Sequence, residues 1–349
     1  MDHIRKTPTI QDVARFAKVS TATVSRALST PGRVREGTRL RVAEAVEATG
    51  YTLNQAARSL RQKNARTILV GLPDIRNTFF STILDAIERE AALRGYGVLV
   101  ANRFSSTDPA RRLREYFRSN RADGLLLLDG SLPIDALINL SGDHASVPIV
   151  VACEDIPNSP FHTVKTDNLV AAECATRHLI DLGHTRLGHI MGPEGNVLRG
   201  ERLAGFSAAL SRANLPLRPD WLFAGDFAME SGREAASRYL ALAERPSAVF
   251  AANDEMAIGF LSGLRAAGIE CPRDISVIGF DDLAVAPHFV PPLSTVRQPR
   301  EALGRLAAEA LIDILEGEGR GHVPLRIVLA SQIIVRGSTA RYSPAPKAD

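Results

Sequence analysis

Residues 21–26 bring small side chains and one arginine onto a single face of a predicted helix. The residues of this face that point outward are Thr21, Ala22, Ser25 and Arg26. A guanidinium donates two parallel hydrogen bonds to the O6 and N7 atoms of guanine. Small side chains let a helix enter the major groove, where Thr21 and Ala22 can contact base edges or a thymine methyl. The pattern therefore predicts a surface that reads double-stranded DNA.

Three hydroxyl side chains, on Thr9, Ser20 and Thr23, lie where the sequence predicts helix N-termini. Exposed N–H groups and the helix dipole favour phosphate at such positions, so these hydroxyls are candidates for contacts that set the register of the protein on DNA. The alternative is that they only cap their helices, and one residue can do both.

The predicted reading surface needs a small core to position it. Thr9 followed by Asp12 forms a capping-box pattern that starts a first helix, Ser20 caps a second, and residues 38–49 form a third that ends at Gly50. The apolar residues that recur at helical spacing on the inner faces are Ile10, Val13, Ala14, Ala17, Val24, Leu28, Val42, Ala45 and Val46. Helices in this order predict a helix-turn-helix unit.

Basic side chains are concentrated in the same part of the sequence. Residues 1–66 contain 13 Lys and Arg against 5 Asp and Glu, whereas residues 67–349 contain 29 against 34. A positive patch neutralises phosphates and releases counterions, so it predicts DNA binding that weakens steeply with salt. A solvated, solubilising face would show the same bias, and the helix chemistry must decide between the two.

Residues 54–61 contain good helix formers but span only about two turns, too few for a stable isolated helix. Leu60 is apolar on an otherwise basic segment, as expected of a wedge inserted between base steps of the minor groove. The alternative is a linker leucine that packs on its own domain. The candidate DNA contacts of this segment are Asn54, Ala57, Leu60 and Arg61.

From Thr67 onward, short apolar runs alternate with amphipathic segments. Apolar runs at 68–72, 97–101, 124–128 and 149–152 are interleaved with predicted helices near 79–94 and 108–118. Such alternation predicts a parallel α/β sheet built from right-handed crossovers. The pattern repeats from 169 to 279, so the sequence predicts two lobes of similar design.

Ligands of open α/β sheets bind at the carboxyl ends of the strands, and a two-lobed protein can close on them. The residues near predicted strand ends that suit a hydroxylated ring are aromatic, Phe79, Phe80 and Phe227, or polar, Arg202, Asn253, Asp281 and Gln298. Ordinary core packing of the phenylalanines and a structural ion pair between Asp281 and Arg202 are the alternatives.

Ordered motifs along most of the chain carry a family resemblance. They are Thr-Ile-Gln-Asp-Val-Ala at 9–14, Val-Ser-Thr-Ala-Thr-Val-Ser-Arg-Ala-Leu at 19–28, Ala-Arg-Ser-Leu at 57–60, Thr-Asp-Asn at 166–168, Arg-Leu-Ala-Gly-Phe at 202–206 and Ile-Gly-Phe-Asp-Asp at 278–282. In this order they resemble the lactose-repressor (LacI/GalR) family. The polar and aromatic candidates match effector contacts of that family, and Cys153 and Asn196 align with its variable ligand positions.

The resemblance implies an α/β protein with an all-α helix-turn-helix headpiece (residues 1–52), a hinge helix and linker (53–66), and a two-lobed body like periplasmic binding proteins (67–340), followed by a tail (341–349). It also implies three crossings between the lobes, so that the first lobe takes about 67–165 with 298–322 and the second about 166–297 with 323–340. We therefore expect a ligand-responsive repressor that binds a palindromic operator as a homodimer and responds to a nucleoside or a sugar.

Two other classes of protein fit parts of the sequence. An enzyme acting on a sugar or nucleoside could use the same polar groups, and Asp281 and Asp282 could hold a metal or act as a base. The common nucleophile, P-loop, zinc-protease and dinucleotide motifs do not occur, however. An exported solute-binding protein would need a signal peptide instead of the basic headpiece. We expect a cytoplasmic protein without a cofactor, metal site or membrane span.

Overall fold

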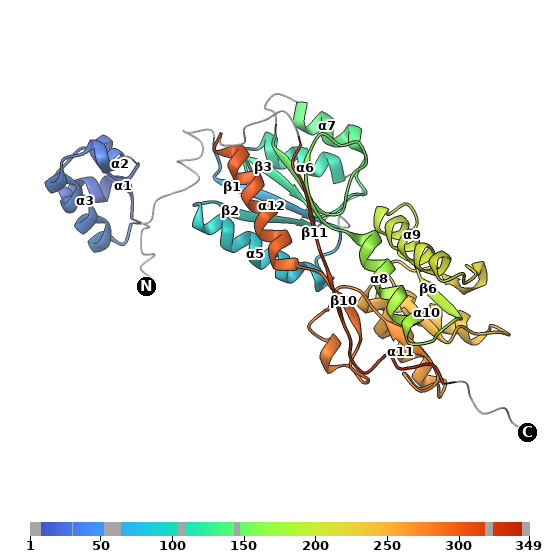
Figure 1. Ribbon diagram of the computed structural model, residues 1–349. Helices are drawn as coiled ribbons and strands as arrows, with labels where there is room; N and C mark the ends of the chain where they lie inside the picture. Colours follow the sequence, from blue (N-terminus) through green and yellow to red (C-terminus); the bar gives the residue numbers. More distant parts are fainter. Residues whose placement is uncertain are drawn as a thin grey trace, which may run out of the picture. The chain divides into compact units, whose positions relative to one another are not determined.

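The computed structural model describes residues 8–29, 31–51, 64–102, 109–142, 147–317 and 324–343 of the 349-residue chain. The chain divides into two units, Met1–Ala65 and Arg66–Asp349, which are drawn in Figure 1 and described separately below. Within the described residues, no helix is long and apolar enough to cross a membrane.

The N-terminal unit contains α1 (Ile10–Ala17), α2 (Thr21–Ser29), a short 3-10 turn (Pro31–Arg33) and α3 (Glu36–Thr49). Its core is formed by the predicted inner faces, with Val13, Val24 and Ala45 fully or almost fully buried. The predicted helices are confirmed, except that α3 begins at Glu36, two residues before the predicted start. Gly50 ends α3 with a φ of 64°, the left-handed conformation expected of a glycine cap.

The local signals that start these helices are present as hydrogen bonds. The Asp12 carboxylate accepts from the Thr9 backbone N–H at 2.9 Å and from the Thr9 hydroxyl at 2.7 Å. Ser20 Oγ accepts from the Thr23 backbone N–H at 3.1 Å. The two bonds from backbone N–H groups satisfy donors that a helix start leaves without an intrahelical partner, so the sequence defines both starts locally.

In the described part of the body, six strands form an all-parallel sheet in the order β11-β5-β4-β3-β1-β2. The strands are β1 (Thr67–Leu72), β2 (Gly97–Asn102), β3 (Gly124–Leu127), β4 (Ile149–Cys153), β5 (His162–Thr166) and β11 (Arg326–Leu329). Helices α5 (Phe79–Leu93) and α12 (Arg300–Leu315) cover one face, and α6 (Pro109–Arg118) and α7 (Ile134–Gly142) cover the other. This is the first lobe (Figure 1).

The second lobe has a parallel sheet of the same design, with the order β7-β6-β8-β9 in its described residues. The strands are β6 (Leu187–Ile190), β7 (Leu222–Phe223), β8 (Ala248–Ala251) and β9 (Ser276–Ile278). Helices α8 (Asn168–Asp181) and α9 (Val197–Arg212) cover one face, and α10 (Met229–Leu240) and α11 (Asp254–Ala266) the other. At Gly205 a Cβ would lie 2.2 Å from the Leu169 carbonyl oxygen, so α9 requires glycine to approach α8 this closely.

Segments that join the lobes lie side by side. β10 (Thr295–Arg297), which leads into α12, pairs antiparallel with β12 (Gln332–Ile334), which follows β11. The sequence places all of residues 323–340 in the second lobe, but β11 pairs with β5 in the first sheet, so the chain leaves the first lobe only after Leu329. The four residues of β11 are too few for hydrophobic periodicity to show which sheet the strand joins. Its pairing with β5 places it in the first sheet.

Candidate nucleic-acid interface and effector site

Helix α2 presents the predicted reading residues on its outer side. Thr21, Ala22 and Arg26 are exposed and Ser25 is half-buried, while Val24 and Ala27 face the core. The side chains that pack the unit and those proposed to contact bases therefore lie on different faces of one helix. This geometry suits insertion of α2 into a major groove.

The hydroxyls at the helix starts serve as caps. Ser20 Oγ lies 2.8 Å from Thr23 Oγ1 in addition to its bond with the Thr23 backbone, and the Thr9 hydroxyl donates to Asp12. Thr9 and Ser20 nevertheless remain exposed. Capping thus accounts for their types, and phosphate contact stays a prediction.

The predicted contacts of the linker, Asn54, Ala57, Leu60 and Arg61, lie outside the described residues. The minor-groove wedge at Leu60 therefore stays a prediction.

In the body, a chain of hydrogen bonds joins strand ends from the two lobes. Gln298 follows β10, and its amide donates to Asp281 Oδ1 at 2.7 Å, just beyond the end of β9. Thr166, the last residue of β5, donates from its hydroxyl to Gln298 Oε1 at 2.8 Å. The structure thus brings Asp281 and Gln298 together and adds Thr166, which the sequence-based set omits.

Arg202 on α9 is buried at the centre of this region. Its Nε and Nη2 donate to Asn168 Oδ1 at 3.1 and 2.9 Å, and its Nη1 donates to the Ala252 carbonyl. The guanidinium carbon lies 3.8 Å from the ring centre of Phe280 and 5.8 Å from that of Phe227. Among the ion pairs of the described residues none joins Arg202 to Asp281, so the neutral Asn168, not that carboxylate, is the direct partner.

Glu154 is a buried carboxyl that directly follows Cys153 at the end of β4; the sequence places it at a strand end beside the cleft, but the predicted effector contacts do not include it. Its Oε2 accepts from the Gly130 backbone N–H at 2.8 Å, and its two oxygens lie 3.2 and 3.3 Å from Asn196 Nδ2. Asn196 also caps α9, accepting from Leu198 N at 2.8 Å. Because α9 belongs to the second lobe, the contact between Asn196 and Glu154 links the lobes.

Burial controls the charge of this cluster. It raises the pKa of Asp281 to about 6 and, with the nearby carboxylate of Asp129, that of Glu154 to about 7. Burial likewise lowers the pKa of Arg202. It also raises the pKa of the Cys153 thiol, which is therefore uncharged at neutral pH. With a pKa of about 7, Glu154 is partly protonated near neutrality, so its carboxyl can both accept and donate hydrogen bonds to a ligand.

The aromatic candidates differ in their surroundings. Phe79 and Phe80 are buried at the start of α5, with ring centres 5.1 Å apart in an edge-to-face arrangement, and belong to the core of the first lobe. Phe227 is half-buried and covers Gly192, where a Cβ would lie 2.4 Å from the ring. Asn253, the cap of α11, donates to the Phe227 carbonyl at 2.8 Å. Core packing accounts for the first pair, and Phe227 is the most accessible of the three.

Asp282 has a structural role. Its carboxylate accepts from Arg297 Nε and from Arg336 Nη2, both at 2.6 Å. Burial raises its pKa, but these two guanidinium groups outweigh burial and lower it overall. Across the described part of the chain, no group of three or more His, Cys, Asp or Glu residues could hold a metal ion.

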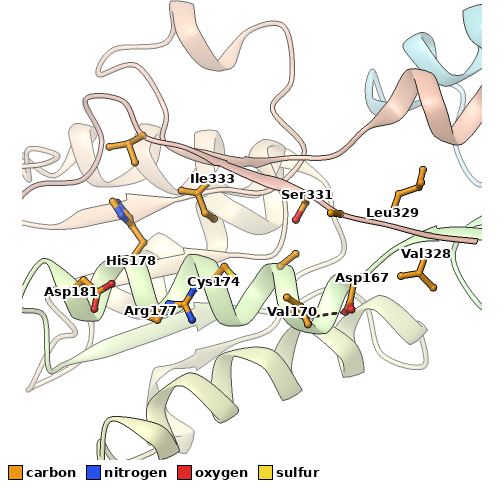
Figure 2. Close-up of a pocket in the computed structure, with 13 residues that line it drawn as sticks. Asp167, Val170, Cys174, Arg177, His178, Asp181, Val328, Leu329, Ser331 and Ile333 are labelled. Atoms are coloured by element: carbon orange, nitrogen blue, oxygen red, sulfur yellow. Dashed lines mark hydrogen bonds between the residues drawn. The ribbon is translucent and has the colours of Figure 1, made fainter.

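A separate groove of about 590 Å³ lies between α8 and residues 328–335. Figure 2 shows Val170, Cys174 and His178 of α8 facing Leu329 and Ile333 of the connecting segment. Val170, Cys174 and His178 recur at helical spacing and form one face of α8. Asn168, which contacts Arg202, lies on a different face. None of the predicted effector residues is among the described residues that line the groove.

Comparison with known proteins gives matches along most of the chain. Residues 9–54 match the family described as "Bacterial regulatory proteins, lacI family", and residues 176–339 match "Periplasmic binding protein-like domain". The HTH-type transcriptional repressor CytR of Escherichia coli (strain K12) is 39% identical over 331 residues, which cover 95% of this chain and 96% of that protein. The repressor PurR of Aliivibrio salmonicida (strain LFI1238) is 36% identical over 306 residues, covering 87% and 91%.

Solved structures agree with these matches. The Lac repressor dimer bound to operator and the anti-inducer ONPF has a TM-score of 0.85 at 27% identity, covering 96% of this chain and all of that chain. The transcriptional regulator CelR in complex with cellobiose has a TM-score of 0.72 at 33% identity, covering 95% and 99%.

Proposed function

Because this chain belongs to the LacI family of bacterial regulatory proteins, we propose that it represses transcription from a near-palindromic operator under the control of a nucleoside bound between its lobes. The protein is a ligand-responsive repressor that acts as a homodimer, and it is not an enzyme. We also place the protein in the cytoplasm, where operator DNA is found.

We assign the reading of bases to α2. Thr21, Ala22 and Ser25 are small enough for the helix to approach the base edges closely. Arg26 donates two parallel hydrogen bonds to a guanine. Thr9, Ser20 and Thr23 hold the backbone phosphates, and the linker residues around Leu60 enter the minor groove. One headpiece offers few base contacts, so specificity comes from two headpieces on the two half-sites.

The observation that carries the effector site is the hydrogen-bonded cluster that spans the lobes. Asp281 bonded to Gln298, and Glu154 bonded to Asn196, are the groups with which a ribose or base would exchange hydrogen bonds. Phe227 offers an aromatic face to a planar ring. A ligand that replaces these internal bonds changes how the lobes are held together, and through the hinge it changes how two headpieces meet DNA. A sugar uses the same polar groups and is the alternative.

Two measurements test this function. Thermal unfolding is followed with nucleosides, purine bases and sugars, and the true effector stabilises the protein by RT ln(1 + [L]/Kd). Binding of a fluorescent operator duplex is then titrated with and without that compound. A stabilising compound that leaves operator affinity unchanged contradicts control of DNA binding, and turnover of any compound contradicts the non-enzymatic role.

A further inference from the structure

A basic surface on α6 and the loop after it has no role in the function described so far. Residues 111–121 contain the five arginines Arg111, Arg112, Arg114, Arg118 and Arg121 and a single acidic residue, Glu115. Residues 67–349 as a whole carry more acidic than basic side chains, 34 against 29. A local positive surface on an acidic body favours an anionic partner at this place.

The surface contains a depression. A depression of about 560 Å³ is lined by Arg112, Glu115, Tyr116, Arg118, Ser119 and Arg121. We call this set the α6 arginine patch. The guanidinium carbon of Arg121 lies 4.8 Å from the ring centre of Tyr116, a cation–π contact that orients the guanidinium. Glu115, the one acidic residue of 111–121, is paired with Arg111 at 3.3 Å.

The patch lies beside the point where the chain enters the body from the headpiece. Asp123, two residues after Arg121, is hydrogen-bonded to Thr67 in both directions: its carboxylate accepts from Thr67 N at 3.1 Å, and its N–H donates to Thr67 O at 2.8 Å. Thr67 is the first residue of β1 and follows the linker directly. The patch therefore lies near the residue at which the linker joins the body.

We propose that the α6 arginine patch binds the phosphate backbone of duplex DNA that flanks the operator. This contact would be independent of sequence and made by the body, in addition to base reading by α2. Guanidinium groups match phosphate oxygens in charge and geometry, and DNA presents phosphates at regular spacing along its length. The inference rests on the proposed function, since it needs the headpiece to bring DNA to the body.

The test compares full-length wild type with a variant carrying Arg118→Glu and Arg121→Glu. An operator is first selected from a random-sequence pool. The affinity of both proteins is then measured for this operator on a short duplex and on a duplex extended by about ten base pairs at each end. Wild type is expected to bind the extended duplex about tenfold more tightly, and the variant to lose this advantage. For the variant, the slope of log K against log salt concentration should also be less steep, by about 0.9 for each phosphate that the variant no longer neutralises.

A matched control variant reverses the charge of two other arginines by substitution with Glu. These are Arg238 and Arg265, which are exposed on α10 and α11 of the second lobe. An equal loss in this control would show a general charge effect and overturn the proposal. So would an unchanged advantage of the extended duplex in the patch variant. A third overturning result is stabilisation of wild type by inorganic phosphate without any flank effect, because the patch would then bind small anions.

Two further measurements keep the outcomes distinct. Arg118→Gln with Arg121→Gln replaces the charge reversal if that variant unfolds at lower temperature than wild type, and the same loss is expected from it. If wild type does not prefer the operator to a scrambled duplex, the proposed repressor function fails. If it prefers the operator and shows no flank effect, only the role of the patch fails.

Discussion

The headpiece and the body use their functional side chains in opposite ways. In the headpiece the proposed contacts project from one exposed helix face, and the residues behind them form a small core. In the body most of the proposed polar contacts are buried and hydrogen-bonded within the protein, as Gln298 is to Asp281, whereas Phe227 and Asn196 are half-buried. An exposed surface is free to meet any DNA, whereas a buried cluster must exchange internal bonds for ligand bonds. Regulation therefore belongs to the body and recognition to the headpiece.

The strongest test of this division removes residues 1–62. Specific operator affinity should fall by about a thousandfold or more, because the helix that reads the bases is absent and only weak electrostatic binding remains. Ligand-dependent thermal stabilisation should persist, because the buried cluster is complete in residues 66–349. Anisotropy titrations and thermal shifts measure the two properties, and retained operator specificity would contradict the division.

Arg202→Ala tests the body alone. The Asn168 amide oxygen and the Ala252 carbonyl would lose their buried donor, and the free energy of unfolding should fall by about 2–4 kcal/mol. Effector stabilisation should disappear, while operator affinity at temperatures where the variant is folded should stay near that of wild type. Arg199→Ala, on the same helix but half-exposed, is the control and should change stability by less than about 1 kcal/mol. Denaturant titration measures both.

The raised pKa of Glu154 gives the body a pH dependence. Folding favours the protonated carboxyl, whose pKa rises from its ordinary 4.5 to about 7, so stability should fall as pH increases between these values and level off above them. The loss across this window is expected to be roughly 3 kcal/mol. Glu154→Gln should make this fall smaller, with the part due to Asp281 remaining, and the exposed Glu88→Gln should leave it unchanged. A stability that rises from pH 5 to 7 in wild type but not in Glu154→Gln would contradict the assignment.

The same contrast explains how much of the molecule the sequence could predict. The starts of α1 and α2 depend on partners three residues apart, Thr9 with Asp12 and Ser20 with Thr23, and both were predictable. The bond between Thr166 and Gln298 spans 132 positions, so no local pattern contains it. Strand ends point to Asp281 and Arg202 as effector contacts, because the carboxyl edge of a parallel sheet is a general site for ligands, and this role stays a prediction.

Missed elements have a similar physical cause. β5 reads His-Thr-Val-Lys-Thr and lacks an apolar run, and its Lys165 is accommodated by ion pairs with Glu201 and Asp155 at 2.8 and 3.2 Å. The helix α9 begins at Val197 because Asn196 caps it there. In each case a tertiary or capping partner supplies what hydrophobic periodicity does not.

The headpiece is tested most finely by Arg26→Ala. Arg26 is exposed on α2 and contributes nothing to the core, so thermal stability should be unchanged. If the guanidinium donates two hydrogen bonds to a guanine, operator binding should weaken by about 1–3 kcal/mol. The preference for that base pair in each half-site should also be relaxed. Anisotropy titrations against operators substituted one position at a time measure this. A loss of equal size on every sequence would mean that Arg26 binds phosphate, and base reading by the headpiece would then depend on Thr21, Ala22 and Ser25 alone.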